Sequence, residues 1–503
     1  MNNKKRKSGV LMNISSLPGP FGIGVFGGEA KRFVDKIADA GFKIWQILPL
    51  GSLDAGNSPY AADSAFAGNT LYIDPRFLYE RNLVTYAELE ECKYNGSPYT
   101  ADYEFVYEKN DFILKTAFSR IDDEIIEEIE AFEKDNDWVE DYSLFKAVKE
   151  HFDGKPWWEW PDDYSDYKKC EEHKAEFNES MTYYKFTQYL FFTLWKNIKM
   201  YANSKGIDIL GDMPVYMAPD SCDVWAHTEL FQINPETKKP ELVAGVPPDY
   251  FSEDGQLWGN PLYDWKRMEK DNFAWWVERI GFALRIFDTV RIDHFRGLAS
   301  YWAVPADAKS AKEGHWEEGP GQKLFDAVAE EYNNPSIIAE DLGTFGEDVV
   351  SLLESTGFAG MRVIQFGFDP YSGSTSTHLP HNYPSNCYAF IGTHDNNTLL
   401  GWLWEATPPE RDFALEYCGF KGYDWGAGGY HSASCRCIIE NVWRSCADVA
   451  MIAFQDMCGF GSDARMNVPG VPELNWRFRT TDETISKVDF EYFRKINGLF
   501  GRI

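Results

Sequence analysis

Three short apolar segments of the chain each end at a carboxylate. The segments are residues 290–294, 337–341 and 390–395, and the acids that end them are Asp293, Glu340 and Asp395. A short apolar run that stops at polar residues is typical of a buried parallel strand whose C-terminal end opens onto a site. In a (β/α)8 barrel, catalytic side chains come from the C-terminal ends of several strands. We therefore predict that the three acids meet at the mouth of such a barrel.

Two carboxyl groups in one pocket are the groups that glycosidic bond cleavage requires, because one attacks the sugar carbon and the other protonates the leaving oxygen. Asp293 follows Arg291 by two residues, so both side chains point to the same side of a strand. A permanent cation beside Asp293 keeps the carboxylate ionised, as a nucleophile must be. Glu340 follows three apolar residues, and a dry pocket raises the pKa of a carboxyl group toward the value that a general acid needs. Asp341 competes for this role, but strand alternation points it the opposite way.

Asp395 has His394 beside it and is predicted to hold sugar hydroxyl groups by charge-assisted hydrogen bonds that tighten in the transition state. Any one of the acids alone reads best as a salt-bridged residue at a strand end. Three together favour catalysis, because functional polar residues concentrate at barrel mouths. Asp212 ends a further apolar segment, and two interpretations stay open for it: a fourth site residue, or a cap of the following turn.

Composition favours a soluble protein with a neutral or cationic ligand. Aromatic residues make up 16% of the 503 residues, a proportion that suits ring stacking on sugars but also suits a large core. The net charge is 49 − 79 = −30, which disfavours nucleic acids and anionic membranes as partners. The basic N-terminus leads into an apolar run that is broken within a few residues and lacks a cleavage site, so we predict a cytoplasmic protein. The nine cysteines show no zinc-ligand spacing, and we expect free thiols with no metal or cofactor.

Eight segments are predicted to be barrel strands, at residues 10–14, 44–50, 208–215, 289–293, 336–340, 361–366, 388–393 and 449–454. The first two flank a helix predicted at 29–40, and this β-α-β start with short connections indicates a parallel sheet. Helical stretches at 122–134 and 182–205 lie in a charged, aromatic region between strands two and three. We predict a barrel of residues 1–67 and 202–503, with a mostly helical insertion at 68–201 and long loops over the barrel mouth. One such loop, 244–265, is predicted to be irregular but ordered and to present aromatic rings, among them Tyr250, Phe251, Trp258 and Tyr263, and Leu257.

The chain resembles the amylomaltases, also called disproportionating enzymes or 4-alpha-glucanotransferases, relatives of the α-amylases. The matching motifs span nearly the whole chain and lie at 58–60, 64–69, 211–216, 244–252, 255–261, 291–297, 339–343, 392–395 and 464–467. The Val-Pro-Pro-Asp-Tyr-Phe motif at 246–251 is the most specific, whereas Arg-Ile-Asp alone indicates only the wider clan. The resemblance implies that Asp293 is the nucleophile, Glu340 the acid/base and Asp395 the transition-state stabiliser. It also implies that Tyr60, Asp212, Trp258, Arg291, His294 and His394 line the sugar subsites.

The same resemblance implies transfer of an α-1,4-glucan segment to the 4-position of glucose or a maltooligosaccharide by a retaining double displacement. The partners expected are maltooligosaccharides and α-1,4-glucans. Two alternatives stay open: an α-amylase-type hydrolase and an inactive glucan-binding protein. The aromatic loop favours transfer because stacked rings hold an acceptor sugar, and the complete set of acids argues against a binding protein.

Overall fold

The fold centres on a closed parallel barrel in a computed structural model that describes residues 6–248, 253–343, 346–471 and 474–503. The barrel strands are β1 (Lys7–Leu11), β2 (Ile44–Gln46), β3 (Asp208–Met213), β8 (Thr289–Ile292), β11 (Ile337–Ala339), β12 (Gly360–Val363), β13 (Cys387–Phe390) and β14 (Val449–Ala453). Their order in the sheet is β11-β8-β3-β2-β1-β14-β13-β12. A parallel bridge between Ile338 and Ala359 joins the two ends of this sheet and closes the barrel. The (β/α)8 prediction is confirmed.

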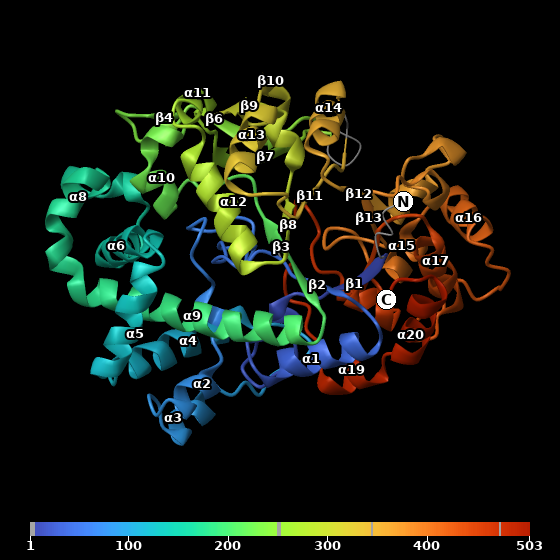
Figure 1. Ribbon diagram of the computed structural model, residues 1–503, viewed down its shortest axis with the longest axis horizontal. Helices are drawn as coiled ribbons and strands as arrows, with labels where there is room; N and C mark the ends of the chain where they lie inside the picture. Colours follow the sequence, from blue (N-terminus) through green and yellow to red (C-terminus); the bar gives the residue numbers. More distant parts are fainter. Residues whose placement is uncertain (1–5, 249–252, 344–345, 472–473) are drawn as a thin grey trace.

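The barrel is filled by side chains and is not a pore. Its central layer consists of Ile44, Leu210, Ile338, Met361, Val363, Phe390, Val449 and Met451, all buried. Most strands end earlier than predicted, so that the acids follow the last ladder residue instead of belonging to it. Around the outside lie α1 (Gly28–Asp39), α9 (Asn178–Ser204), α12 (Ala274–Ile286), α13 (Gln322–Glu331), α14 (Glu347–Thr356), α15 (Leu399–Glu405), α17 (Ala433–Arg444) and α20 (Phe490–Leu499) (Figure 1).

Between β2 and β3 the chain is helical and lies to one side of the barrel (Figure 1). Its helices are α2 (Pro75–Glu80), α3 (Tyr86–Glu91), α4 (Tyr103–Phe118), α5 (Asp123–Lys134), α6 (Trp138–His151), α7 (Asp162–Ser165) and α8 (Tyr167–His173), followed by α9. The long helix α9 packs against α5 and α6 and also against α1 and β3 of the barrel. The division into an insertion at 68–201 and a barrel at 1–67 and 202–503 stays a proposal, and its second boundary falls inside α9.

The segment predicted as an irregular loop, 244–265, contains the end of one strand and the whole of another, so the prediction of irregular structure is wrong for these parts. Strands β6 (Leu242–Val246) and β7 (Gln256–Pro261) join β9 (Ser300–Pro305) and β10 (His315–Glu318) in an antiparallel sheet of order β10-β9-β6-β7. The pairing of β6 with β9 brings together residues more than fifty positions apart, and local pattern does not reveal such a partner.

The ring-presenting character of this segment holds only in part. Leu257 and Trp258 are exposed, whereas Tyr263 is buried. The predictions for Tyr250 and Phe251 lie outside the described residues. No helix in the described ranges combines the length and apolar character needed to cross a membrane.

Candidate active site

Asp293 and Glu340 leave neighbouring strands at the same level of the barrel mouth. Strands β8 and β11 pair in parallel with Ile292 opposite Ala339, and the two acids are the next residues along each chain. The Glu340 N–H donates to the Ile292 carbonyl at 3.0 Å, which extends the ladder by one bond. Neighbouring strands lie about 4.8 Å apart, so the backbones of the two acids are about one strand spacing apart.

Arg291 links two carboxylates. Its Nη1 lies 2.7 Å from an Asp212 oxygen and 2.7 Å from an Asp293 oxygen. The first pair follows from register, because Asp212 of β3 lies directly opposite Arg291 of β8. Burial lowers the pKa of Arg291, but the two carboxylates outweigh it and hold that pKa above its ordinary value. The predicted contact between Arg291 and Asp293 is therefore present, and the guanidinium stays charged.

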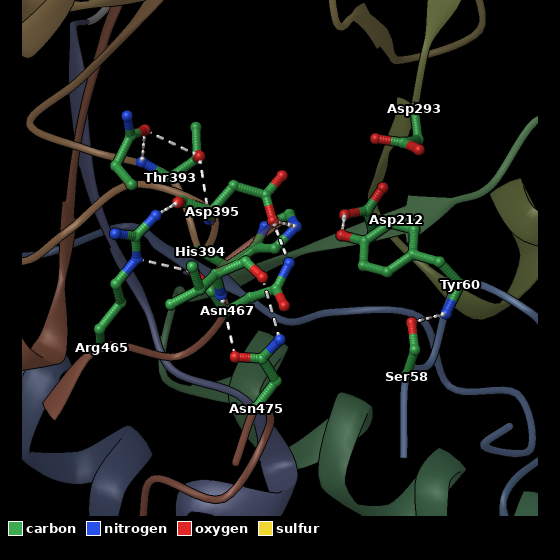
Figure 2. Close-up of polar contacts among 12 residues, drawn as sticks. Ser58, Tyr60, Asp212, Asp293, Thr393, His394, Asp395, Arg465, Asn467 and Asn475 are labelled. Atoms are coloured by element: carbon green, nitrogen blue, oxygen red, sulfur yellow. Dashed lines mark hydrogen bonds and ion pairs between the residues drawn. The ribbon is translucent and has the colours of Figure 1, made fainter. Parts of the chain in front are cut away.

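Asp212 lies inside the cluster. Besides Arg291, it accepts a hydrogen bond from the Tyr60 hydroxyl at 2.7 Å (Figure 2). Burial raises the pKa of Asp212, and the Arg291 charge opposes that shift. The Tyr60 ring stacks on the His394 ring, with centroids 5.1 Å apart and planes 17° apart. Asp212 of β3 thus fixes Arg291 of β8 and Tyr60 of the segment after β2, and these two strands flank β3 in the barrel.

Glu340 is half-buried and accepts two backbone hydrogen bonds. Its oxygens take the N–H groups of His294 at 2.9 Å and Leu342 at 2.8 Å. Burial raises the pKa of Glu340 to about 8, with Arg291 opposing the shift and the Asp293 charge adding to it. The carboxyl group is therefore protonated at neutral pH. Asp341 points the opposite way, as alternation predicts, and pairs with Arg362 at 2.8 Å.

The rings of His294 and Trp258 pack against each other, and His294 also binds Glu340 through its backbone. His294 follows Asp293 in a left-handed conformation, with φ of 49°, and its ring meets the Trp258 ring edge-on at 4.7 Å. Burial lowers the pKa of His294 to about 4, so the imidazole is neutral at neutral pH. The Trp258 side chain remains 37% exposed. A rigid neutral ring beside an accessible indole is a surface on which a sugar ring can stack.

Asp395 lies across the cluster from Asp293 (Figure 2). Its Oδ1 accepts a hydrogen bond from the Asn467 amide at 2.6 Å, and its backbone carbonyl accepts one from Arg465 at 2.6 Å. The His394 Nε2 lies 3.4 Å from the same Oδ1. These contacts fix the carboxylate while its side chain remains 45% exposed to the mouth.

The nine predicted site residues thus lie in one connected cluster. Sequence reasoning missed Asn467 and Arg465 as supports of Asp395, although the motif at 464–467 contains both. It also missed Trp476, a buried ring whose centroid lies 5.9 Å from that of Tyr60 and 5.8 Å from that of His394. No pattern around Trp476 marks it in the sequence.

Comparison with known proteins agrees with this geometry. The sequence profile described as 4-alpha-glucanotransferase matches residues 12–484, which is most of the chain. The chain belongs to the 4-alpha-glucanotransferase family. A 4-alpha-glucanotransferase of Clostridium butyricum is 42% identical, over 98% of this chain and 100% of that protein. A 4-alpha-glucanotransferase of Thermus thermophilus is 43% identical over 94% of each chain.

Solved structures share the fold of this chain. An amylomaltase from Streptococcus agalactiae in complex with acarbose superposes with a TM-score of 0.94 at 36% identity, covering 99% of this chain and 100% of the other. A trehalose-6-phosphate hydrolase from Bacillus licheniformis, 10% identical, shares the fold with a TM-score of 0.52 over 100% of this chain and 84% of the other.

Proposed function

We propose that this member of the 4-alpha-glucanotransferase family transfers segments of α-1,4-glucans by double displacement, with Asp293 as nucleophile and Glu340 as acid/base. The observation that carries the proposal is the contrast between two adjacent acids. Asp293 is ion-paired with the buried Arg291, whereas loss of contact with water raises the pKa of Glu340 to about 8. One carboxylate and one carboxylic acid on neighbouring strands are the pair that a retaining mechanism needs.

In the first step, an Asp293 oxygen attacks the anomeric carbon of the donor. Glu340 gives its proton to the glycosidic oxygen, which leaves on the departing sugar chain. The product is a glycosyl ester on Asp293 with Glu340 ionised. Asp395, held by Asn467, accepts hydrogen bonds from sugar hydroxyl groups and favours the distorted, positively charged transition state.

In the second step, the 4-hydroxyl group of an acceptor glucan attacks the ester. Ionised Glu340 takes the hydroxyl proton, a new α-1,4 bond forms and Asp293 is released. Exchange of one such bond for another leaves the free energy nearly unchanged, so shorter and longer products both accumulate. Tyr60, Asp212, Trp258, Arg291, His294 and His394 are proposed to line the sugar subsites.

A hydrolase on the same barrel remains the second candidate, because it shares every step until the acceptor attacks. The exposed indole of Trp258 and the neutral His294 ring against which it packs favour transfer, since they offer an acceptor sugar an apolar surface that water does not bind. An inactive binding protein would not need a protonated Glu340 next to an arginine-paired Asp293.

Incubation with maltotriose tests the proposal. We expect glucose together with a ladder of longer maltooligosaccharides, read by chain length, with the total number of reducing ends constant. Products that are only shorter, with steadily rising reducing ends, would support the hydrolase. No new products at all would support the binding protein.

A further inference from the structure

An exposed tryptophan packs on the segment that leads from β14 toward the residues that hold Asp395. Trp404 lies near the end of α15, and its side chain is 48% exposed. The indole is held in place, because its N–H donates to the Gly426 carbonyl at 3.1 Å. A Cβ atom built on Gly461 would lie 2.3 Å from the Trp404 ring, so the ring packs directly on the glycine backbone. One side of a fixed indole is therefore covered and the rest faces solvent.

The tryptophan is connected to the candidate active site by a short chain of hydrogen bonds. Ser462, next to Gly461, donates to Glu405 at 3.3 Å and accepts from Asn397 at 2.9 Å. Asn397 follows Asp395 by two residues. Three residues along from Ser462, Arg465 holds the Asp395 carbonyl. The segments on both sides of Trp404 are thus hydrogen-bonded to the residues around Asp395.

The strand order places Trp404 and Trp258 at opposite sides of the mouth. Trp258 packs on His294, directly after β8, and Trp404 packs on Gly461, in the segment that follows β14. In the closed order β11-β8-β3-β2-β1-β14-β13-β12, β8 and β14 are four strands apart in either direction. A linear glucan that crosses the mouth from Trp258 past Asp293 and Asp395 then leaves it on the side of Trp404.

The chemistry around Trp404 fits a sugar. A flat apolar ring packs against the C–H face of a pyranose, and carboxylates at its edge accept hydrogen bonds from hydroxyl groups. Glu405 and Asp463 are exposed on the two segments that meet at the indole, and the Asp463 carboxylate reaches to 3.3 Å from the same Cβ position on Gly461. The carboxylates of Glu405 and Asp463 repel anionic polymers, whereas they do not repel a neutral glucan.

We propose that Trp404, with Glu405 and Asp463, is an outlying subsite for long α-1,4-glucan chains, beyond the sugars held at Asp395. The inference deepens the proposed function and rests on it. Because the site lies away from the reacting bond, it adds binding energy only for chains long enough to reach it. It therefore sets the preference for chain length and takes no part in bond cleavage.

The test compares Trp404→Ala with the wild type on maltotriose and on maltoheptaose. We expect the ratio of kcat/KM for maltoheptaose to that for maltotriose to fall by about five- to tenfold, the effect of losing one aromatic contact. Trp404→Phe, which keeps a flat ring, restores most of the ratio. Tyr86→Ala, at an exposed ring on α3 in the insertion, is the matched control and leaves the ratio unchanged.

An unchanged ratio in Trp404→Ala would overturn the inference. So would an equal loss on both substrates, because a merely structural role does not depend on chain length. Calorimetric binding of the two sugars to Asp293→Asn, with and without Trp404→Ala, gives a readout without turnover, and only the dissociation constant of maltoheptaose should rise. If the wild type forms no products that are longer than maltotriose, the proposed function itself would be refuted.

Discussion

Arg291 contacts two carboxylates whose surroundings differ. Asp212 is fully buried and also bound by the Tyr60 hydroxyl, whereas the Asp293 side chain is 25% exposed at the mouth. Asp212 can therefore only bind the guanidinium, whereas Asp293 is accessible to a substrate. The same cation that pairs with Asp293 is also bonded to Asp212, which binds the Tyr60 hydroxyl. Nucleophile and sugar-facing ring are thus positioned by one buried ion pair.

The first prediction is that Asp293 forms the covalent bond. An amide is a poor nucleophile of nearly the same volume, so Asp293→Asn should fold normally and lose essentially all turnover. A slow-turnover glycosyl fluoride should label the wild type, and peptide mass analysis should place the sugar on the peptide that contains Asp293. Label on Glu340 or Asp395, or substantial activity in a well-folded Asp293→Asn variant, would contradict the assignment.

The second prediction concerns the proton on Glu340. Because the pKa of Glu340 is about 8 and the donor must be protonated, kcat/KM for maltotriose should be constant near neutral pH and fall as the pH rises above about 8. Glu340→Gln removes the proton donor and should lower this rate by at least ~10²-fold. With a glycosyl fluoride donor the leaving group needs no proton, so the first step should lose far less and its alkaline decline should disappear. Equal losses for both donors would show that Glu340 is not the acid.

At the scale of elements, a helix of the insertion holds the loop that carries Tyr60. The Lys146 ammonium of α6 lies 2.8 Å from an Asp63 carboxylate oxygen, and Ser52 donates to the other oxygen at 2.5 Å. The Asp63 carbonyl also accepts the N–H of Cys222, in the segment after β3. Asp63, which lies three residues after Tyr60, therefore connects three parts of the chain.

The third prediction is that Lys146 positions Tyr60. In Lys146→Met, Asp63 keeps its charge without its cation, the loop shifts, and kcat/KM for maltotriose should fall by about tenfold or more, since small displacements of a binding group are costly. Lys146→Arg should restore most of the activity. Lys115→Met on α4, which removes a surface ion pair with Asp111, is the control. Full activity in Lys146→Met with wild-type stability would refute the role of α6 in the site.

The barrel elements were predictable because their signals are local. Each strand is a short apolar run between turns, and α9 shows its buried face in Phe186, Leu190, Leu194 and Ile198, four residues apart. Strands β6 and β7 pair with each other, and β6 also pairs with β9, which lies more than fifty residues further along the chain, so local pattern does not reveal this sheet. The acids could be predicted because each follows an apolar strand in the sequence. Asn467 and Trp476 reach the site from a distant loop, and no local pattern assigns them a role.

At the scale of the whole molecule, a residue that follows the last helix joins the start of β1 to the segment that leads into β14. Arg502 is fully buried, and its guanidinium donates to the carbonyls of Lys7 at 3.1 Å, Trp443 at 2.8 Å and Ala447 at 3.1 Å. It also reaches Ser445 at 3.1 Å. One side chain near the C-terminus thus joins the first strand to the segment that leads into the last.

The fourth prediction follows from this contact. Arg502→Met removes the hydrogen bonds to these buried carbonyl groups, of which Trp443 and Ser445 keep Arg6 as a second donor, so the free energy of unfolding should fall by about 3 kcal/mol. Activity per folded molecule should survive at low temperature, because Arg502 bonds the segments at the N-terminal ends of β1 and β14, whereas the acids follow the C-terminal ends of their strands. Arg494→Met, which removes one hydrogen bond to the Asp39 carbonyl on the surface, is the matched control. Equal melting temperatures for the two variants would contradict the prediction.

The pairing of β1 with β14 also decides when the protein can finish folding. Lys7 lies opposite Val449, and 449 − 7 = 442 residues separate them along the chain. At roughly 5–20 residues per second, a ribosome needs on the order of half a minute or more to make that stretch. Throughout this time β1 offers one edge and an apolar face to any other nascent chain. We therefore expect the yield of active protein in cells to depend on chaperones and on the rate of translation more than on the stability of the finished barrel.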